Sequence, residues 1–148
     1  MIRRLEERDL EQAARLERAC FGKAAWSDAA LNAALRDANA LYLAAEENGE
    51  LIGYCGIWQS FEDGEVMNVA VREECRRQGC ARRLLEELFI QAGERGIRRF
   101  TLEVREGNLP AIRLYEALGF VTEGIRKDFY DNPKENALIM WCDGPSPS

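Results

Sequence analysis

The residues with the clearest chemical potential lie between Val66 and Leu85, where an apolar segment leads through a basic connection into a helix with one apolar face. Five of the 20 basic residues of this acidic chain fall between Arg72 and Arg83. The first turn of a helix exposes unpaired N–H groups and about half a positive charge, and Gly79 lets the backbone approach a ligand closely. We therefore expect an anion site, most naturally for phosphate or pyrophosphate. A solvated basic helix cap is the alternative that composition leaves open.

Candidates for proton transfer are few, because the chain contains no histidine. This excludes Ser-His-Asp and Cys-His nucleophile systems and every zinc site that uses histidine. Carboxylates are therefore the leading candidates, and Glu103 lies between Leu102 and Val104 in an alternating segment. Alternation alone favours an outward, solvated Glu103. A well-placed carboxylate could instead accept a proton from a reacting amine.

Composition limits the compartment and the partners. The net charge is −6 and the isoelectric point about 4.9, which argues against a protein that grips nucleic acid. The opening MIRRLEERDL is too charged for a secretory signal, and no run of 18 apolar residues predicts a membrane span. The five cysteines include no C-x-x-C pair, so we expect free thiols in the cytoplasm. One of them, Cys80, lies in the predicted anion loop, where a helix N-terminus can lower a thiol pKa.

The elements that must position these residues follow from periodicity. The length of 148 residues fits one compact domain, residues 1–142, with a frayed tail over 143–148. The predicted order is β-α-α-β-β-β-α-β-α-β-β, a mixed α/β domain with early antiparallel hairpins and one crossover through the helix of Leu84. We expect N-caps at Asp9 and Ser27 and a strand over 66–71 that is buried on both faces. The last two strands, 120–125 and 137–142, should flank a loop over 126–136.

Two motifs carry a family resemblance. Arg76-Arg77-Gln78-Gly79-Cys80-Ala81 lies between a strand and a helix and matches Arg/Gln-x-x-Gly-x-Gly/Ala. It resembles the acetyl-coenzyme A signature of the GCN5-related N-acetyltransferase (GNAT) superfamily, and Asn108, Tyr115 and Gly119-Phe120 resemble its second signature. The resemblance spans about residues 2 to 142. Within the superfamily the chain is similar to the RimI type, through Trp26-Ser27, Asn68-Val69-Ala70-Val71, Leu102-Glu103-Val104-Arg105 and Phe129-Tyr130.

The resemblance implies a fold and a function. The fold is that of the acyl-CoA N-acyltransferases, with splayed central strands. The activity is acetyl transfer from acetyl-CoA, without a metal, to the N-terminal amine of a protein, namely the N-terminal alanine of the eighteenth small-subunit ribosomal protein. Two alternatives stay open: a related acetyltransferase of a lysine or a small amine, and a non-catalytic module that senses acetyl-CoA.

The resemblance also implies roles for single residues. Glu103 would be the general base and Tyr115 the general acid that protonates the departing thiolate. Phe129, Tyr130 and Trp26 would shape the acceptor pocket. The cofactor would contact strand amides freed near a bulge and a pyrophosphate loop, and these residues are Val69, Ala70, Val71, Arg77, Gln78, Gly79, Cys80, Ala81, Arg82, Asn108 and Tyr115. The residues alone also allow purely structural roles. Tyr115 could pack in the core, Asn108 could serve only as an N-cap, Phe129 and Tyr130 could be a surface pair, and Trp26 could pack against the start of the second helix.

The free energy needed to neutralise the amine differs between the types of acceptor. An α-amine titrates near 7.7–8.0, so its neutralisation at pH 7 costs about 1–1.4 kcal/mol, whereas a lysine amine costs about 4.6 kcal/mol. The acidic residues Glu62, Asp63 and Glu65 could attract a basic peptide, although acidic turns are usually only solvated. Two departures from the family pattern stand out: Ala81 replaces the second glycine, and Phe129 stands where a tyrosine is common.

Overall fold

The computed structural model describes residues 1–131 and 133–144. Seven strands form one sheet in the order β1-β2-β3-β4-β5-β7-β6. They are β1 (Ile2–Arg4), β2 (Ala40–Glu47), β3 (Glu50–Ser60), β4 (Asp63–Val71), β5 (Arg99–Arg105), β6 (Val121–Tyr130) and β7 (Glu135–Cys142). The α-helices are α1 (Leu10–Phe21), α2 (Asp28–Arg36), α3 (Cys80–Glu94) and α4 (Leu109–Ala117), and the 3-10 helices are η1 (Glu7–Asp9), η2 (Gly22–Ala24) and η3 (Glu73–Cys75). The predicted order of strands and α-helices is confirmed.

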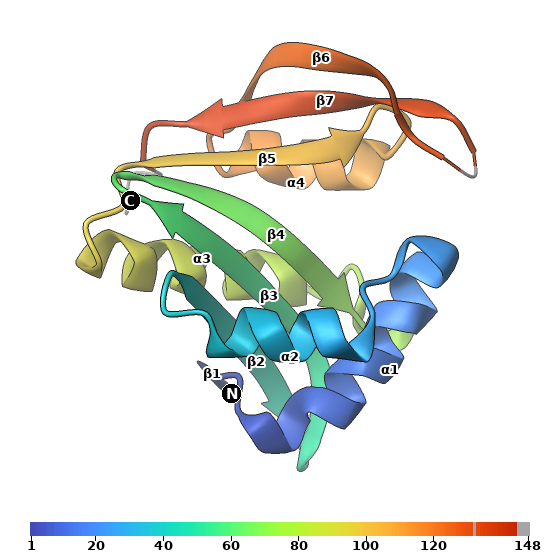
Figure 1. Ribbon diagram of the computed structural model, residues 1–148, viewed down its shortest axis with the longest axis vertical. Helices are drawn as coiled ribbons and strands as arrows, with labels where there is room; N and C mark the ends of the chain where they lie inside the picture. The colour runs from blue at the N-terminus through green and yellow to red at the C-terminus, as the bar shows by residue number, and fades with distance from the viewer. Residues whose placement is uncertain (132, 145–148) are drawn as a thin grey trace.

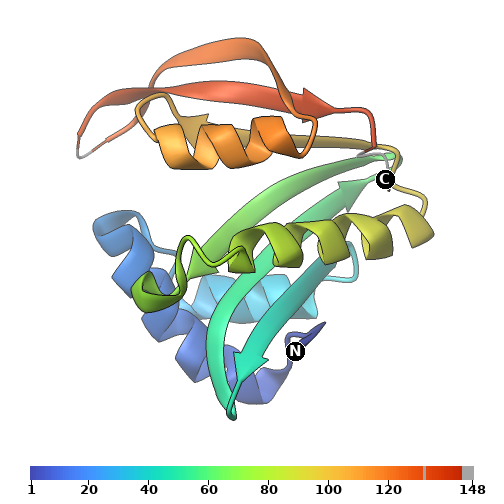
Figure 2. The same ribbon diagram turned by 180° about the vertical axis from the view of Figure 1, so that it is seen from behind.

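The helices cover the two faces of the sheet unequally. Helices α1 and α2 lie on the near face in Figure 1, over β2 to β4, whereas α3 and α4 lie on the opposite face, which Figure 2 brings forward. The apolar side chains of α3, such as Leu84 and Leu88, form one core with β2 to β5, and those of α1, such as Ala13 and Leu16, form a second core with Tyr42 and Tyr54. Among the residues that the structure describes, no helix covers the near face of β5, β6 and β7 (Figure 1).

The first four strands pair antiparallel in chain order, as predicted. Asn48 and Gly49 form the turn between β2 and β3 with φ of 52° and 79°, a conformation that asparagine and glycine tolerate. Helix α3 then carries the chain across the sheet, and β5 pairs parallel to β4. The predicted crossover through Leu84 is therefore present.

The pairing of β4 with β5 ends after three residues. Asp63, Gly64 and Glu65 pair with Arg99, Phe100 and Thr101, and no pair follows. Because the strands are parallel and pair at their N-terminal ends, they separate toward their C-terminal ends, as Figure 1 shows. We call residues 66–71 of β4 and 102–105 of β5 the divergence. The expectation of splayed central strands is confirmed.

Some local predictions were wrong. Asp9 does not cap α1, because its carboxylate accepts hydrogen bonds from the Glu6 amide and the Arg3 guanidinium instead. The predicted loop over 126–136 is mostly strand, since β6 continues to Tyr130. The N-cap at Ser27 is confirmed by the Ala30 amide, 3.1 Å from Ser27 Oγ.

The end of the predicted tail, residues 145–148, lies outside the described residues. Among the helices that the structure describes, none combines the length and the apolar composition needed to cross a bilayer.

Candidate active site

The unpaired edge of β4 presents the backbone amides of Val69 and Val71. The Arg72 amide donates to the Ile52 carbonyl at 2.8 Å, and in an antiparallel ladder bonded pairs alternate with non-bonded pairs. Val71 lies opposite Gly53 and Val69 opposite Cys55, so both are non-bonded positions. Their peptide groups therefore face away from β3, toward the divergence.

A β-bulge sets the direction of this edge. Asn68 pairs with Gly56 and Val66 pairs with Ile57, so Met67 has no opposite residue in β3. An extra residue of this kind bends and twists its strand. The side chain of Met67 is 38% exposed, so the prediction that the strand is buried on both faces was wrong at this position. The bulge lies one residue before Asn68 and two before the outward amide of Val69.

The connection between β4 and α3 forms an amide-rich turn. Gly79, the residue before α3, has φ +78°, and Arg77 has φ +64°. The amides of Gly79, Cys80, Ala81 and Arg82 donate no hydrogen bond to the described residues, as expected for the first turn of a helix. The Arg83 amide makes the first bond of the helix, to the Gly79 carbonyl at 3.0 Å. The residues present therefore fit a pyrophosphate, which needs N–H donors and positive charge.

The arginines around this turn divide into two groups. Arg76 is tied to the end of β4, because its Nε donates to the Val71 carbonyl at 3.1 Å. Arg83 Nη1 donates to the Gln78 carbonyl at 3.1 Å and braces the turn. Arg77 and Arg82 are exposed, and Arg82 has only a 3.7 Å contact with Glu86. The exposed pair leaves its charge free for an anionic ligand.

Cys80 is not activated by its place at the start of α3. Its side chain is buried and lines a cavity of about 330 Å³ together with Ile2, Ala45 and Ile52. Burial, more than any charge, raises the pKa of the Cys80 thiol, and nearby Arg83 opposes that shift. The possibility of a lowered thiol pKa at Cys80 was therefore wrong. The effect of desolvation on the thiol pKa is larger than the effect of the helix terminus.

Glu103 lies in the divergence, on the sheet face that no helix covers. Its neighbours Leu102 and Val104 point into the core, so the alternation of a strand turns Glu103 to the other face. The side chain is 21% exposed, and Arg126 Nε lies 3.7 Å from Oε2. This oxygen is buried and accepts no hydrogen bond from the described residues. A buried oxygen without a hydrogen-bond partner is unusual in a folded protein. It is therefore available to a ligand or to a proton.

Two titratable side chains stand close to Glu103. Burial raises the pKa of Glu65, and the Glu103 charge raises it further while Arg126 lowers it. Burial and the Glu103 charge likewise raise the pKa of Tyr130, against the effect of Arg105. These shifts mark a partly desolvated carboxylate cluster, in which a cationic group would relieve the repulsion between charges.

Tyr115 points from α4 into the core beside the divergence. The residue is 9% exposed, and its ring meets Phe120 edge-on with centroids 6.0 Å apart. Burial raises the pKa of Tyr115 to about 12. Its hydroxyl has no hydrogen-bond partner among the described residues, so the phenol proton is available to a ligand.

Asn108 begins α4, as the sequence predicts. Its Oδ1 accepts from the Ala111 amide at 3.3 Å, which confirms the plain N-cap that the residues alone allowed. The amide Nδ2 of Asn108 donates no hydrogen bond among residues 1–131 and 133–144. Both the cap and a ligand contact are therefore compatible with this side chain.

The predicted acceptor residues lie on two different segments. Trp26 lies between η2 and α2, half-buried against the core of α1. Phe129 and Tyr130 end β6, with rings in edge-on contact at 5.0 Å. Arg126 lies over the Phe129 ring and Arg105 over the Tyr130 ring, at 5.3 and 4.4 Å. The pair lies at the surface, since Phe129 is exposed, and each ring contacts a guanidinium group.

Sequence reasoning missed a buried polar cluster beneath β4. Glu17 on α1 is 1% exposed and accepts hydrogen bonds from Tyr54, Asn68 and the Trp26 amide. The signal was present, because Glu17 falls three and four residues after Ala14 and Ala13, on the apolar face of the predicted helix.

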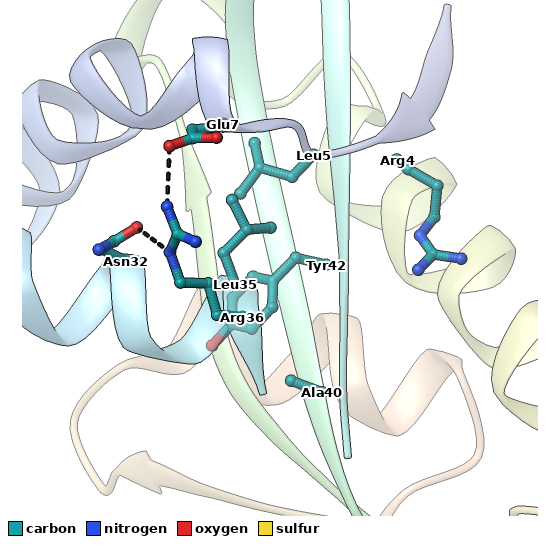
Figure 3. A pocket seen from close by; sticks show the side chains of 8 residues that line it. All are labelled: Arg4, Leu5, Glu7, Asn32, Leu35, Arg36, Ala40 and Tyr42. Carbon is teal, nitrogen blue, oxygen red and sulfur yellow. Dashed lines mark hydrogen bonds and ion pairs between the residues drawn. The ribbon is translucent and has the colours of Figure 1, made fainter. Parts of the chain in front are cut away.

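A second cavity, of about 290 Å³, lies away from these residues. Figure 3 shows it between the β1–η1 segment, α2 and β2, with Arg36 bridging Asn32 and Glu7. Glu7 and Arg36 pair with each other there, and none of the predicted site residues lines the cavity. Among the described residues no group of three or more Cys, Asp or Glu side chains could hold a metal ion.

The comparisons with known proteins agree with this geometry. The family model of the acetyltransferase (GNAT) family matches residues 5–120. The chain belongs to the GNAT family. A Bacillus subtilis relative, provisionally named [ribosomal protein bS18]-alanine N-acetyltransferase, is 35% identical over 95% of this chain and 93% of its own length. The Escherichia coli K12 enzyme of that name is 36% identical over 64% of this chain and 65% of its own.

A solved structure extends the similarity to the whole fold. The crystal structure of the Escherichia coli ribosomal-protein-S18-alanine N-acetyltransferase superposes with a TM-score of 0.89 at 30% identity. The match covers 100% of this chain and 96% of that one. This GNAT chain therefore shares its full architecture with an N-terminal acetyltransferase.

Proposed function

We propose that this GNAT protein transfers the acetyl group of acetyl-CoA to the N-terminal α-amine of a protein, the N-terminal alanine of the eighteenth small-subunit ribosomal protein. The observation that carries the proposal is the divergence. At one opening of the sheet it brings together the outward amides of β4, the amide-rich turn before α3 and Glu103 Oε2, which accepts no hydrogen bond from the described residues. The relatives named for the same activity support the choice of acceptor.

The turn before α3 would hold the cofactor. The amides of Gly79, Cys80, Ala81 and Arg82 would donate to the pyrophosphate, with charge from Arg77 and Arg82. Acetyl-CoA, when bound, supplies the acetyl group as a thioester. The amides of Val69 and Val71 would donate to the thioester carbonyl, where negative charge develops during transfer. Gln78, Ala70 and Asn108 would complete the contacts.

Glu103 and Tyr115 would move the two protons. Glu103 takes a proton from the attacking amine as the new N–C bond forms, directly or through one water molecule. Tyr115 donates its phenol proton to the sulfur as the C–S bond breaks. The two roles balance, because one proton leaves the amine and one reaches the thiolate.

Trp26, Phe129 and Tyr130 would shape the acceptor pocket. The carboxylates of Glu65 and Glu103 favour a cationic N-terminus there, because burial and the Glu103 charge raise the pKa of Glu65 and a cation would oppose that shift. An α-amine also gives up its proton at about 3 kcal/mol less cost than a lysine amine at pH 7. The ribosomal acceptor supports the cytoplasm as the compartment.

A competition between amines tests the proposal. The protein is incubated with acetyl-CoA and either a peptide that begins Ala-Arg, the same peptide with a blocked N-terminus and an internal lysine, or a polyamine. Free thiol is followed with time, and mass spectrometry locates the acetyl group. We expect thiol release with the free N-terminus and the label on its α-amine. Turnover only with the lysine peptide or polyamine would reassign the acceptor, and tight CoA binding without any turnover would indicate a sensor.

A further inference from the structure

The buried carboxylate of Glu17 joins two segments that the proposed reaction uses separately. Oε2 accepts from the Trp26 backbone amide at 2.9 Å, and Oε1 accepts from Asn68 Nδ2 at 3.3 Å. Oε1 also accepts from the Tyr54 hydroxyl. One side chain of α1 therefore connects the acceptor-side segment at Trp26 with the strand that carries the outward amides.

The hydrogen-bond network continues to Tyr42 on β2. Tyr42 donates from its hydroxyl to Asn68 Oδ1 at 2.9 Å. The Tyr42 ring lies over Gly56, where an added Cβ would stand 2.0 Å from Tyr42 Cε1. Gly56 is also the residue paired with Asn68 across β3 and β4. A glycine opposite Asn68 is thus required for Tyr42 to reach the amide.

The order of donors and acceptors in this network is fixed. Tyr42, Asn68, Tyr54 and the Trp26 amide all donate, and the chain of donors ends on the two oxygens of Glu17. Only a carboxylate presents acceptors on both sides, because a glutamine has one oxygen and two N–H groups. Burial of an ionised carboxylate is costly, so a residue that only fills space would not be a glutamate.

The hydrogen-bond network ends at Trp26 and at Asn68, and both lie next to segments that the proposed reaction uses. Trp26 lies outside any helix, and its amide has Glu17 as its partner. Asn68 follows the bulge residue Met67 and precedes Val69, whose amide faces the divergence. A shift of Asn68 would therefore move the Val69 amide, and a loss of the Trp26 bond would free the acceptor-side segment.

We propose that Glu17 is a positioning residue that holds the acceptor-side segment at Trp26 and the outward amides of β4 in one fixed relation. The inference rests on the proposed function and adds a residue that touches neither substrate. Its effect is on the acceptor and on the transfer step. Among the described residues Glu17 makes its hydrogen bonds to Trp26, Asn68 and Tyr54 and none to the turn before α3, so we expect binding of coenzyme A to be independent of it.

Glu17→Gln tests this inference at nearly constant shape. We expect the KM for the Ala-Arg peptide to rise about tenfold and kcat to fall about tenfold, because one donor of the network then faces an N–H group. The Kd of coenzyme A, measured by calorimetry, should stay within about twofold. Tyr54→Phe removes one donor and keeps the ring, so the same changes should appear in smaller size even where Glu17→Gln folds poorly.

A double variant provides the rescue. In Glu17→Gln with Asn68→Asp, the new amide at position 17 donates to the new carboxylate at position 68, and the remaining oxygen at 17 accepts from the Trp26 amide. Tyr42 still donates to position 68, and Tyr54, which also lies within hydrogen-bond reach of position 68, turns its hydroxyl proton to that carboxylate. We expect KM and kcat to return to within about threefold of the wild-type values. Failure of this rescue, with a folded double variant, would overturn the fixed donor order.

Asp9→Asn is the matched control, since Asp9 is another buried carboxylate with a backbone and a side-chain donor. It should lower the melting temperature and leave KM and kcat unchanged. The proposal is overturned if Glu17→Gln behaves in the same way as this control.

Hydrogen exchange keeps the test independent of turnover. Glu17→Gln should speed amide exchange in both residues 22–27 and residues 66–71, with β6 and β7 unchanged. Faster exchange confined to residues 22–27 would overturn the coupling. If the wild-type protein acetylates no amine at all, the proposed function fails, and this exchange pattern alone decides whether Glu17 couples the two segments.

Discussion

At the scale of single residues, Glu103 and Tyr115 have different surroundings. Glu103 is partly exposed, and Arg126 Nε lies 3.7 Å from its Oε2. Tyr115 is buried without a charged partner, and its pKa of about 12 keeps the phenol protonated. A phenol that stays protonated at neutral pH can serve as the proton donor of the reaction.

Glu103→Gln should lower kcat by about 10²–10⁴-fold, because a glutamine cannot accept the proton of the amine. The Kd of coenzyme A should change little, since Glu103 lies on β5 and the amide-rich turn lies before α3. Steady-state kinetics and calorimetry provide the two measurements. Glu106→Gln, at an exposed position three residues later, is the matched control. Equal activity of Glu103→Gln and the control would remove Glu103 from the role of base.

Tyr115→Phe should slow transfer by about 10²–10⁴-fold, through loss of the proton donor to the thiolate. A pKa of about 12 predicts further that the wild-type rate does not fall through tyrosine ionisation below about pH 11. A pH profile of kcat checks this. A descending limb near pH 10 that disappears in Tyr115→Phe would contradict the burial of the phenol, and an unchanged rate would reduce Tyr115 to a packing residue.

At the scale of elements, the turn between β4 and α3 depends on the backbone conformation of one residue. Gly79 must adopt φ +78° so that the first amides of α3 point outward together. A Cβ at this position would also meet Arg83 Nη1 at 3.3 Å. The helix itself is long and has a buried apolar face, so the junction depends on the turn and not on the helix.

Gly79→Ala should destabilise the protein by about 1–2 kcal/mol, the cost of the left-handed conformation for a residue with Cβ. We also expect the Kd of coenzyme A to rise about tenfold, because the relaxed turn no longer aligns the amides. Gly93→Ala is the control in the same helix: no atom lies within 4 Å of the added Cβ, so the variant should be neutral or more stable by up to about 1 kcal/mol. Equal coenzyme A affinity in both variants would contradict the role of the turn.

Elements also show which parts of the fold the sequence could predict. Ser27 and the Asn48-Gly49 turn follow rules that act over four residues, and both were predicted correctly. The extension of β6 to Tyr130 was not, because Arg126-Lys127-Asp128 is polar and Asp128 has φ 53°. The strand continues there because it forms hydrogen bonds with β7. One of them is donated by the Asp128 amide to Asn136 Oδ1 at 3.0 Å.

The candidate site residues came from two sources in the sequence. The family resemblance indicated Glu103 and Tyr115, and the basic turn around Gly79 indicated an anion site. Glu17 and its partners come from α1, β2, β3 and β4, and no local pattern joins them. A buried charge that is satisfied by distant donors becomes visible only when the chain is folded.

At the scale of the whole molecule, an ion-pair cluster fastens the N-terminal segment to the sheet. Arg3 on β1 bonds Asp9 of η1 at 2.7 and 2.9 Å and Glu46 of β2 at 2.7 Å. The Arg3 hydrogen bond lowers the pKa of Asp9, against the opposing effect of burial. Because the carboxyl pKa is lower in the folded than in the unfolded chain, Asp9 stabilises the fold above the unfolded value of about 3.9.

Asp9→Asn should therefore lower the free energy of unfolding by about 3 kcal/mol at pH 7, since it leaves the Arg3 charge without its buried partner. As the pH falls below about 4 the wild-type protein loses this contribution, so the two proteins should approach each other in stability. Urea unfolding between pH 3 and pH 7 measures the difference. A difference that stays constant with pH would contradict the ionised pair.

A sheet that parts in its middle has four edges where an ordinary open sheet has two. Strands β1 and β6 end the sheet on the outside, and residues 66–71 and 102–105 add two inner borders. Any such border can recruit a foreign strand, which is how soluble proteins begin to aggregate. Concentrated solutions of the protein should therefore scatter light sooner alone than with coenzyme A, which would occupy the inner borders. The feature proposed to receive the thioester thus also sets how the protein is best stored.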